Sequence, residues 1–218
     1  MRERLGTIEV RRELAILDYR PMLAIDAPKP PKGDHFDVEV KFDGFRCGAI
    51  IEAGRLRLIS RQGTNFTSWF PELADLASDV ASTDALLDGE IIAGAGDVES
   101  FNVLLRRARL RGRSASSALP VSFVAFDLLW HDGADFTQHP LEERRTHLRA
   151  LVTESSRLAV SRIYADGPEL LAIAATHGLE GIVAKDRRSV YEPGRRSRAW
   201  FKTKVPDAHL AHEWNGDA

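Results

Sequence analysis

The chain has 218 residues, of which 44% are hydrophobic and 28% are charged, and its formal net charge is -2. These proportions are those of an ordinary globular protein with a substantial core. The single cysteine, Cys47, excludes a disulfide framework and indicates a reducing, cytoplasmic setting. No apolar run approaches the roughly 20 residues that span a bilayer, so no membrane partner is expected. Because the net charge is slightly negative, a nucleic-acid partner would have to bind a local basic patch.

Residues 36–41 carry the first informative pattern of the chain. Apolar and polar residues alternate there, which predicts a strand that ends at Lys41, and residues 47–51 resume as a second apolar run. The dipeptide Asp43-Gly44 between the two runs is typical of a tight turn, so we expect a hairpin. In isolation, a lysine at such a place is most often an exposed surface residue.

The remaining elements follow from the same periodicities. They are helices over 69–80, 101–110, 141–151 and 168–177, and strands over 55–60, 85–93, 121–130, 158–163, 181–185 and 200–204. Ser100 is placed to cap the second helix, whose Arg106, Arg107 and Arg109 are expected to face solvent. The mixed order, with hairpins at the start, predicts an α+β fold with largely antiparallel sheets.

Five short stretches combine an apolar strand with charged residues at its end. They are Lys41-x-Asp43-Gly44-x-Arg46, Asp88-Gly89-Glu90, Phe126-Asp127, Glu180-Gly181-Ile182-Val183-Ala184-Lys185 and Trp200-Phe201-Lys202-Thr203-Lys204. Together they supply a lysine nucleophile, carboxylates for a divalent metal ion, an aromatic ring and cations for phosphate. These are the groups that nucleotidyl transfer through a covalent intermediate requires.

In this order and at these spacings, the five stretches resemble the covalent nucleotidyltransferase superfamily, and most closely the adenylation domain of ATP-dependent DNA ligases. The resemblance runs from about Pro21 to Lys204. It implies an ATP-grasp-like adenylation domain with mainly antiparallel sheets flanked by helices. It also implies a reaction in which AMP joins a lysine, passes to a DNA 5′-phosphate and is displaced by a 3′-OH that seals a nick during DNA repair or recombination.

The resemblance assigns roles to single residues of this sequence. It makes Lys41 the amine that attacks the α-phosphate of ATP, a step that needs the neutral amine. Glu39 lies where the family holds the adenine edge, and Phe126 is the ring that stacks on adenine, a contact that any base could make. Arg46 contacts the ribose or orients the 3′-OH side of the nick. Asp88 is expected to be structural, and a structural role also stays open for Glu39 and Phe126.

Cations and carboxylates complete the nucleotide site that the resemblance implies. Lys202 and Lys204 alternate on one strand face and act on the α-phosphate, and Lys185 belongs to the same set of nucleotide-binding cations. Glu90 binds the ribose or supports a metal ion, and Glu180 is the second metal-linked carboxylate. The ion would be Mg²⁺ or Mn²⁺, held by few carboxylates together with phosphate and water.

One segment is strongly basic although the net charge of the whole chain is slightly negative. Residues 185–204 carry eight lysines and arginines against two acidic residues. Arg195, Arg196 and Arg198 are therefore expected to contact the backbone of nicked double-stranded DNA, with a solvated basic loop as the alternative. Arg61, in the stretch Ser-Arg-Gln-Gly, is expected to reach a phosphate of the nucleotide or of DNA.

We expect an appended segment at 1–20, the adenylation domain at 21–205 and a polar tail at 206–218. Only 14 residues follow Lys204, too few for the OB-fold domain that such ligases usually carry next, so a separate OB-fold or repair protein is an expected partner. Two other functions remain open. One is an RNA ligase or a capping-type guanylyltransferase, and the other is a nucleotide- or DNA-end-binding module without turnover.

Overall fold

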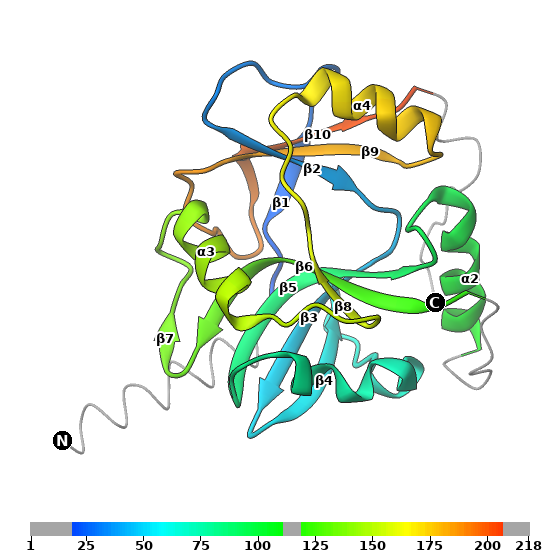
Figure 1. The fold of residues 1–218 in the computed structure, drawn as a ribbon, viewed down its shortest axis with the longest axis vertical. Coiled ribbons are helices and arrows are strands. Elements are labelled where there is room, and N and C mark those ends of the chain that lie inside the picture. The colour runs from blue at the N-terminus through cyan, green and yellow to red at the C-terminus, as the bar shows by residue number, and fades with distance from the viewer. Residues whose placement is uncertain (1–18, 111–118, 207–218) are drawn as a thin grey trace.

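The structure is a computed structural model that describes residues 19–110 and 119–206. The predicted appended segment up to residue 18, and the predicted tail beyond residue 206, lie outside the described residues. The described chain forms two β-sheets with helices on their outer sides (Figure 1). None of its helices, within the described ranges, is long and apolar enough to cross a membrane.

The smaller sheet is built from both ends of the described chain. Its four strands, in the order in which they pair, are β1 (Leu23–Asp26), β10 (Arg196–Lys204), β9 (Gly181–Asp186) and β2 (Phe36–Lys41). β1 runs parallel to β10, and the other two pairs are antiparallel. The strand β9 therefore connects β2, from early in the sequence, to β10, the last strand of the fold.

The larger sheet is built from the middle of the chain. Its strands are β4 (Arg55–Ser60), β3 (Phe45–Glu52), β5 (Asp84–Ala93), β6 (Val121–His131) and β7 (Ala134–Asp135), with β8 (Leu158–Val160) paired to β6. All pairs are antiparallel except β6 with β8, which is parallel. Together with the smaller sheet, this confirms the predicted α+β fold with largely antiparallel sheets.

Short helices complete the fold. They are the 3₁₀ segments η1 (Thr67–Trp69) and η2 (Pro71–Asp79) and the α-helices α2 (Val98–Arg109), α3 (Leu141–Leu151) and α4 (Gly167–Thr176). The helix predicted over 69–80 is thus 3₁₀ rather than α-helical. The predicted cap of α2 was also wrong, because Asp97 is the N-cap and its carboxylate accepts a hydrogen bond from the Ser100 amide.

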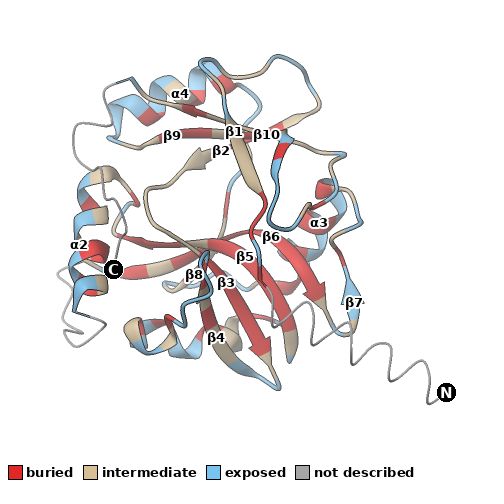
Figure 2. Cartoon of the chain, turned by 180° about the vertical axis from the view of Figure 1, so that it is seen from behind, coloured by how far each residue is buried: buried red, intermediate tan, exposed pale blue. Residues whose placement is uncertain are grey.

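Three groups of buried apolar residues hold these layers together. The largest packs the larger sheet against the η segments, α2 and α3, and includes Phe70, Leu104 and Leu148. A second lies between the two sheets, with Trp130 and Trp200 at its centre. The third packs α4 on the outer face of the smaller sheet. In Figure 2 the strands β3, β5 and β6 of the larger sheet are mostly buried, which explains their apolar runs, whereas β7 is exposed.

The hairpin predicted around Asp43-Gly44 does not form. β2 pairs with β9 in the smaller sheet, whereas β3 pairs with β4 and β5 in the larger one. Gly44 has no positive φ of the kind that a two-residue hairpin turn demands. Instead, a Cβ on Gly44 would overlap the Ile91 carbonyl oxygen and lie 2.8 Å from Glu90 Cγ. The glycine is required because the chain crosses from one sheet to the other in close contact with β5.

The prediction for Arg107 was also wrong, because this residue does not face solvent. Arg107 is 3% exposed and its guanidinium pairs with Glu72. The guanidinium carbon lies 5.4 Å from the ring centroid of Phe70. Arg106, one position earlier on α2, is exposed as expected. An arginine can cover apolar surface with its stem while its charged end reaches a carboxylate.

We expect Arg107→Ala to destabilise the protein by about 1–3 kcal/mol, because it removes packing against Phe70 and a charge-assisted hydrogen bond to Glu72. Arg106→Ala, on the exposed side of the same helix, should change stability by less than about 0.5 kcal/mol. Urea unfolding followed by circular dichroism measures both values. Equal effects of the two substitutions would contradict the burial of Arg107.

Candidate active site

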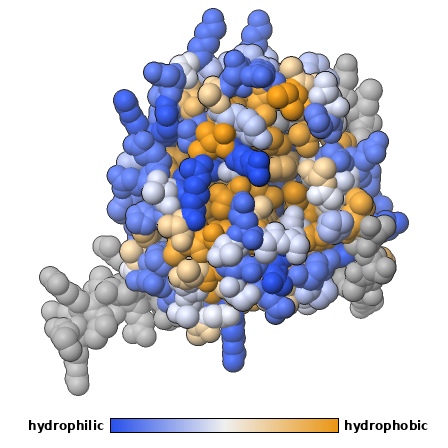
Figure 3. All heavy atoms as spheres, viewed as in Figure 1, coloured by the Kyte–Doolittle hydropathy of each residue, from blue (hydrophilic) through white to orange (hydrophobic). Residues whose placement is uncertain are grey.

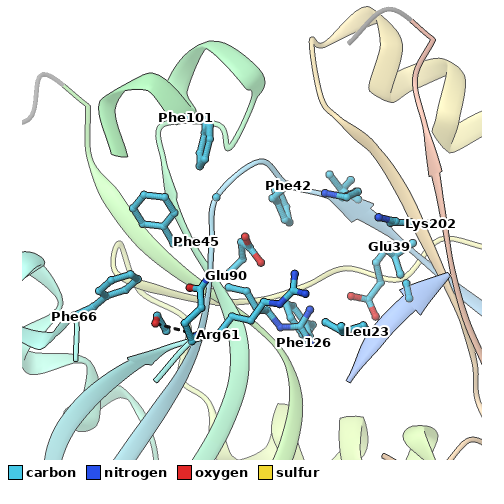
Figure 4. Close-up of a pocket in the computed structure, with 18 of the residues that line it drawn as sticks. Leu23, Glu39, Phe42, Phe45, Arg61, Phe66, Glu90, Phe101, Phe126 and Lys202 are labelled. Atoms are coloured by element: carbon cyan, nitrogen blue, oxygen red, sulfur yellow. Dashed lines mark hydrogen bonds between the residues drawn. The ribbon is translucent and has the colours of Figure 1, made fainter. Parts of the chain in front are cut away.

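A cavity of about 1220 Å³ lies between the facing sides of the two sheets. Glu39 and Lys202 project into it from the smaller sheet, and Glu90 and Phe126 from the larger one (Figure 4). In the view of Figure 1, apolar and strongly hydrophilic side chains lie next to one another in the middle of the surface, and hydrophilic side chains predominate toward its edges (Figure 3). A concave site of mixed character and this size can hold a ligand as large as a nucleotide.

Three charged residues meet at one end of the smaller sheet. Because β9 lies between β2 and β10, Gly181 is the register partner of both Lys41 and Lys204. Glu180, directly before it, forms an ion pair with Lys41, and its Oε1 accepts a hydrogen bond from Lys204 Nζ at 3.0 Å. Burial raises the pKa of Glu180, but the two ammonium groups outweigh that effect and hold its pKa below the usual value.

A second carboxylate, that of Glu39 on β2, lies two residues before Lys41 and is 2% exposed. Its Oε1 accepts a hydrogen bond from Arg145 at 2.8 Å, and its Oε2 accepts hydrogen bonds from Lys185 at 3.1 Å and from the Ser161 hydroxyl at 2.7 Å. Burial opposes ionisation of Glu39, but the charges of Lys185 and Arg145 prevail and lower its pKa. The predicted contact of Glu39 with adenine stays a prediction, and the structure adds a buried network of charges around it.

The ring of Phe126 lies against two cations. Lys185 Nζ is 4.2 Å, and the guanidinium carbon of Arg46 is 4.3 Å, from its centroid. Lys185 also lies 4.5 Å from the ring of Trp200, so its ammonium is held between two aromatic side chains. Burial lowers the pKa of Lys185, and Glu39 counteracts this. A base that stacked on a ring face covered by one of these cations would have to displace it.

Asp88 is completely buried and joins three parts of the fold. It accepts hydrogen bonds from the hydroxyl groups of Tyr19 and Tyr191, each at 2.6 Å, and from two nitrogens of Arg46, each at 2.7 Å. Asp88 is therefore structural, as the sequence suggested, and it fixes Arg46 at the cavity. Tyr19 lies just outside the predicted domain start at residue 21, yet it packs in the core between the sheets.

Two further carboxylates near Lys41 have raised pKa values. Burial raises the pKa of Glu90 to about 7, with Glu180 contributing and with Arg46 and Lys41 opposing it. Burial likewise raises the pKa of Asp43 to about 6, again with a contribution from Glu180. Burial is the largest cause of both shifts, and carboxylates with perturbed pKa values in a cleft are typical of a functional site.

The opposite wall of the cavity is aromatic. Phe45, Phe66 and Phe101 lie together on one side in Figure 4, across from Glu39, and Trp69 completes this wall. It extends the cavity well past the cluster of charges around Lys41. The sequence predicted no role for these residues.

The predicted phosphate and DNA contacts lie at the rim. Arg61, Arg196 and Lys202 line the cavity. Lys202 forms an ion pair at 3.1 Å with an exposed aspartate of β1, and Arg196 donates a hydrogen bond to a backbone carbonyl of that strand. Arg195 and Arg198 are exposed to solvent. Of the six cations predicted to contact phosphate or DNA, three thus line the cavity, two lie on the outer surface, and Lys204 pairs with Glu180 outside the cavity lining.

A divalent ion would find few protein ligands here. Over residues 19–110 and 119–206, no three histidine, cysteine or acidic side chains form a group that could hold a metal ion. Glu90 and Glu180 are hard oxygen donors, which suits Mg²⁺ or Mn²⁺, and both ions readily keep phosphate and water as their remaining ligands. The residues present therefore fit a metal ion that binds together with a phosphate-bearing ligand.

Two arginines of α3 were missed as parts of the site. Arg145 binds Glu39, and Arg144 donates two hydrogen bonds to Asp127 at 2.7 and 2.8 Å. Both are buried. Their positions fall on the inward face of the helix predicted over 141–151, which is the signal that could have found them, because a charged residue on a buried face needs a partner.

The raised pKa of Glu90 leads to a prediction for stability. The folded state binds the Glu90 proton more tightly than an unfolded chain with a pKa near 4.5, so ionising Glu90 costs folding free energy. This cost is absent below about pH 4.5 and fully present above about pH 7. Glu90→Gln, which cannot ionise, should therefore unfold at a higher temperature than the wild type at pH 8. At pH 5 the difference should shrink.

Thermal unfolding without nucleotide, from pH 5 to pH 8, measures this difference. Glu52→Gln, an exposed carboxylate at the far end of β3, is the matched control and should show no such trend. A constant offset between Glu90→Gln and the wild type at all pH values would contradict the raised pKa.

Comparison with known proteins identifies the family. The family model described as "ATP dependent DNA ligase domain" matches residues 21–204. The multifunctional non-homologous end joining protein LigD of Mycolicibacterium smegmatis is 35% identical over 190 residues, which cover 86% of this chain and 24% of that protein. A DNA ligase of Aeropyrum pernix is 35% identical over 202 residues, which cover 85% of this chain and 34% of that protein.

Solved structures give the same result. A mycobacterial DNA ligase D complexed with ATP and MES superposes with a TM-score of 0.70 at 31% identity, covering 85% of this chain and 60% of that chain. The ligase domain of LigD from M. tuberculosis also has a TM-score of 0.70, at 30% identity and with 85% and 59% coverage. The chain spans about a quarter of the LigD protein it matches. It belongs to the family of ATP-dependent DNA ligase domains.

Proposed function

We propose that this chain is the catalytic adenylation domain of an ATP-dependent DNA ligase and that Lys41 carries AMP. The observation that supports this most is the position of Lys41. It lies at the end of β2, where Glu180 and Lys204 meet it, and it lines a cavity large enough for a nucleotide. The family match adds ATP as the nucleotide.

In the first step, Lys41 Nζ forms a bond to the α-phosphorus and pyrophosphate leaves with the bridging oxygen. Lys41 must first leave its ion pair with Glu180 and lose a proton, since only the neutral amine is a nucleophile. Lys204 binds the other oxygen of the same carboxylate, so Glu180 keeps a cationic partner when Lys41 departs. Lys202, at the cavity rim, is placed to offset charge on the phosphates.

Glu90 and Glu180 would hold a Mg²⁺ or Mn²⁺ ion, which would neutralise phosphate charge. Burial raises the pKa of Glu90 to about 7, and a cation beside this carboxylate would favour its ionised form. Arg46, fixed by Asp88, faces the cavity from the larger sheet and is placed to contact the sugar of the nucleotide.

In the later steps, a DNA 5′-phosphate oxygen displaces Lys41 from the α-phosphorus, and a 3′-OH then attacks that 5′-phosphate and releases AMP. Arg61 and Arg196 at the rim, and Arg195 and Arg198 outside it, form a basic border along which the backbone of a nicked duplex could lie. DNA repair in the cytoplasm, and a further OB-fold domain or repair protein that works with this one, are part of the proposal.

Label transfer from ATP tests the nucleophile. Purified protein incubated with Mg²⁺ and α-labelled ATP should acquire covalent label that alkali leaves in place and acid releases, as expected of a phosphoramidate, and Lys41→Ala should acquire none. Lys32→Ala, an exposed lysine in the loop before β2, is the matched control and should label like the wild type. Label from GTP alone would reject a DNA ligase in favour of a capping-type enzyme, and no label from either nucleotide would favour a binding module.

Salt dependence tests the DNA surface. Arg195→Ala combined with Arg198→Ala should weaken binding to a nicked duplex, and the slope of log K against log salt should fall by about 0.9 for each phosphate that the protein no longer neutralises. Lysyl-AMP formation should be unchanged, because neither residue lines the cavity. Arg149→Ala, an exposed arginine on α3, should leave the slope unaltered. An unchanged slope for the double variant would exclude these arginines as DNA-binding residues.

A further inference from the structure

Arg145 connects the floor of the cavity to three separate segments. Its guanidinium donates to Glu39 Oε1 on β2 at 2.8 Å, to the Phe126 carbonyl oxygen on β6 at 3.0 Å, and to the carbonyl oxygen of Ser161 after β8. The side chain is 1% exposed, so no substrate atom needs to touch it. A planar guanidinium with several fixed donors sets both the position and the orientation of the group it binds.

The pair that Arg145 supports, Glu39 and Lys185, is the part of this network that reaches the cavity. Lys185 Nζ lies 3.0 Å from Oε1 and 3.1 Å from Oε2 of Glu39. An ammonium group has three N–H donors, so Lys185 keeps one in addition to those directed at the carboxylate. It also lies 4.2 Å from the ring centroid of Phe126, the residue expected to stack on a base.

An ammonium next to a carboxylate presents a donor beside an acceptor. Adenine offers the matching pattern on its Watson–Crick edge, where N1 accepts and the N6 amino group donates. Guanine offers the reverse, because its N1–H donates and its O6 accepts. With adenine, Lys185 could turn one N–H from Glu39 to N1 while Glu39 accepts from N6, and the number of hydrogen bonds is preserved. With guanine in the same position, O6 would face the Glu39 carboxylate. Two hydrogen-bond acceptors would then oppose each other, and a polar site discriminates strongly against such a ligand.

We propose that Arg145 is a positioning residue that fixes the Glu39–Lys185 pair for adenine and thereby sets the preference of the site for ATP over GTP. This inference rests on the proposed function, since it assumes that the base enters the cavity beside this pair. Burial of Glu39 among Arg145, Lys185 and Ser161 keeps the carboxylate ionised, and hence an acceptor. Without Arg145, Lys185 would be the remaining cationic contact of Glu39. The Glu39 carboxylate would then hold the Lys185 ammonium more firmly.

Arg144 provides a matched control on the same helix. It is also fully buried, and it also binds one carboxylate, that of Asp127, and two carbonyl oxygens, those of His139 and Ser189. None of its hydrogen bonds in the described chain goes to Glu39 or Lys185. Substitutions of Arg144 and Arg145 should therefore cost similar stability, and they should differ only in their effect on the base.

The experiment compares Arg145→Lys, Arg145→Met and Arg144→Met with the wild type. Thermal unfolding reports stability, and lysyl-AMP and lysyl-GMP formation give kcat and KM for ATP and GTP. Direct titration with AMP and GMP reports base preference without any transfer to Lys41. Ser161→Ala, which removes one weaker partner of Glu39, should fold even if the arginine variants do not, and should shift preference in the same direction by less.

We expect the Arg145 variants to lose about 10- to 100-fold of the preference for the adenine nucleotide, the size seen when outer partners of metal ligands are removed. The loss should come mainly from KM. Arg144→Met should keep the wild-type ratio despite a lower unfolding temperature. The inference would be overturned if the Arg145 variants kept the wild-type preference for the adenine nucleotide, or if Arg144→Met lost as much of it as they do. It would also be overturned if the wild type bound AMP and GMP equally well. A wild type that prefers AMP but forms no lysyl-AMP would instead refute the proposed function alone.

Discussion

The position of β9 between β2 and β10 is the constraint on which the site depends. It places Gly181 opposite both Lys41 and Lys204, and so lets one carboxylate, Glu180, reach two ammonium groups. Two residues further along, the same pairing puts Glu39 and Lys202 on either side of Val183. Because side chains of directly opposed residues share a face of the sheet, the register places Lys41, Lys204, Glu39 and Lys202 on one face, and all but Lys204 line the cavity.

Buried charges of this kind are costly, and here they are consistently paired. Each side chain of the pairs Arg144–Asp127 and Arg145–Glu39 is at most 3% exposed. An apolar replacement of a buried pair is often as stable as the pair itself, so stability alone does not explain why such pairs occur. What they add is orientation, because each guanidinium ties a carboxylate to backbone carbonyl oxygens of other segments. The floor of the cavity is thereby held rigid below a wall of aromatic side chains.

The sequence was informative wherever a pattern was local. Alternation and apolar runs predicted most strands, and the order of charged motifs pointed to one cavity. It was misleading at Asp43-Gly44, where turn chemistry suggested a hairpin but the choice of strand partner depends on β9, more than 130 residues away. It also placed Arg107 outside, because helical periodicity does not report whether a neighbouring segment such as η2 covers that face. The pairing of Arg145 with Glu39 links residues 106 positions apart, and no local pattern contains it.

Building the smaller sheet from both ends of the chain has a consequence for the order of folding. Strands β3 to β6 follow one another in sequence and can pair as they emerge from the ribosome, whereas β1 and β2 must wait for β9 and β10. Closing a loop of that length carries a large entropic cost before its contacts compensate for it. The larger sheet should thus form first during synthesis, and Lys41 should acquire its surroundings only when the last strand has been made.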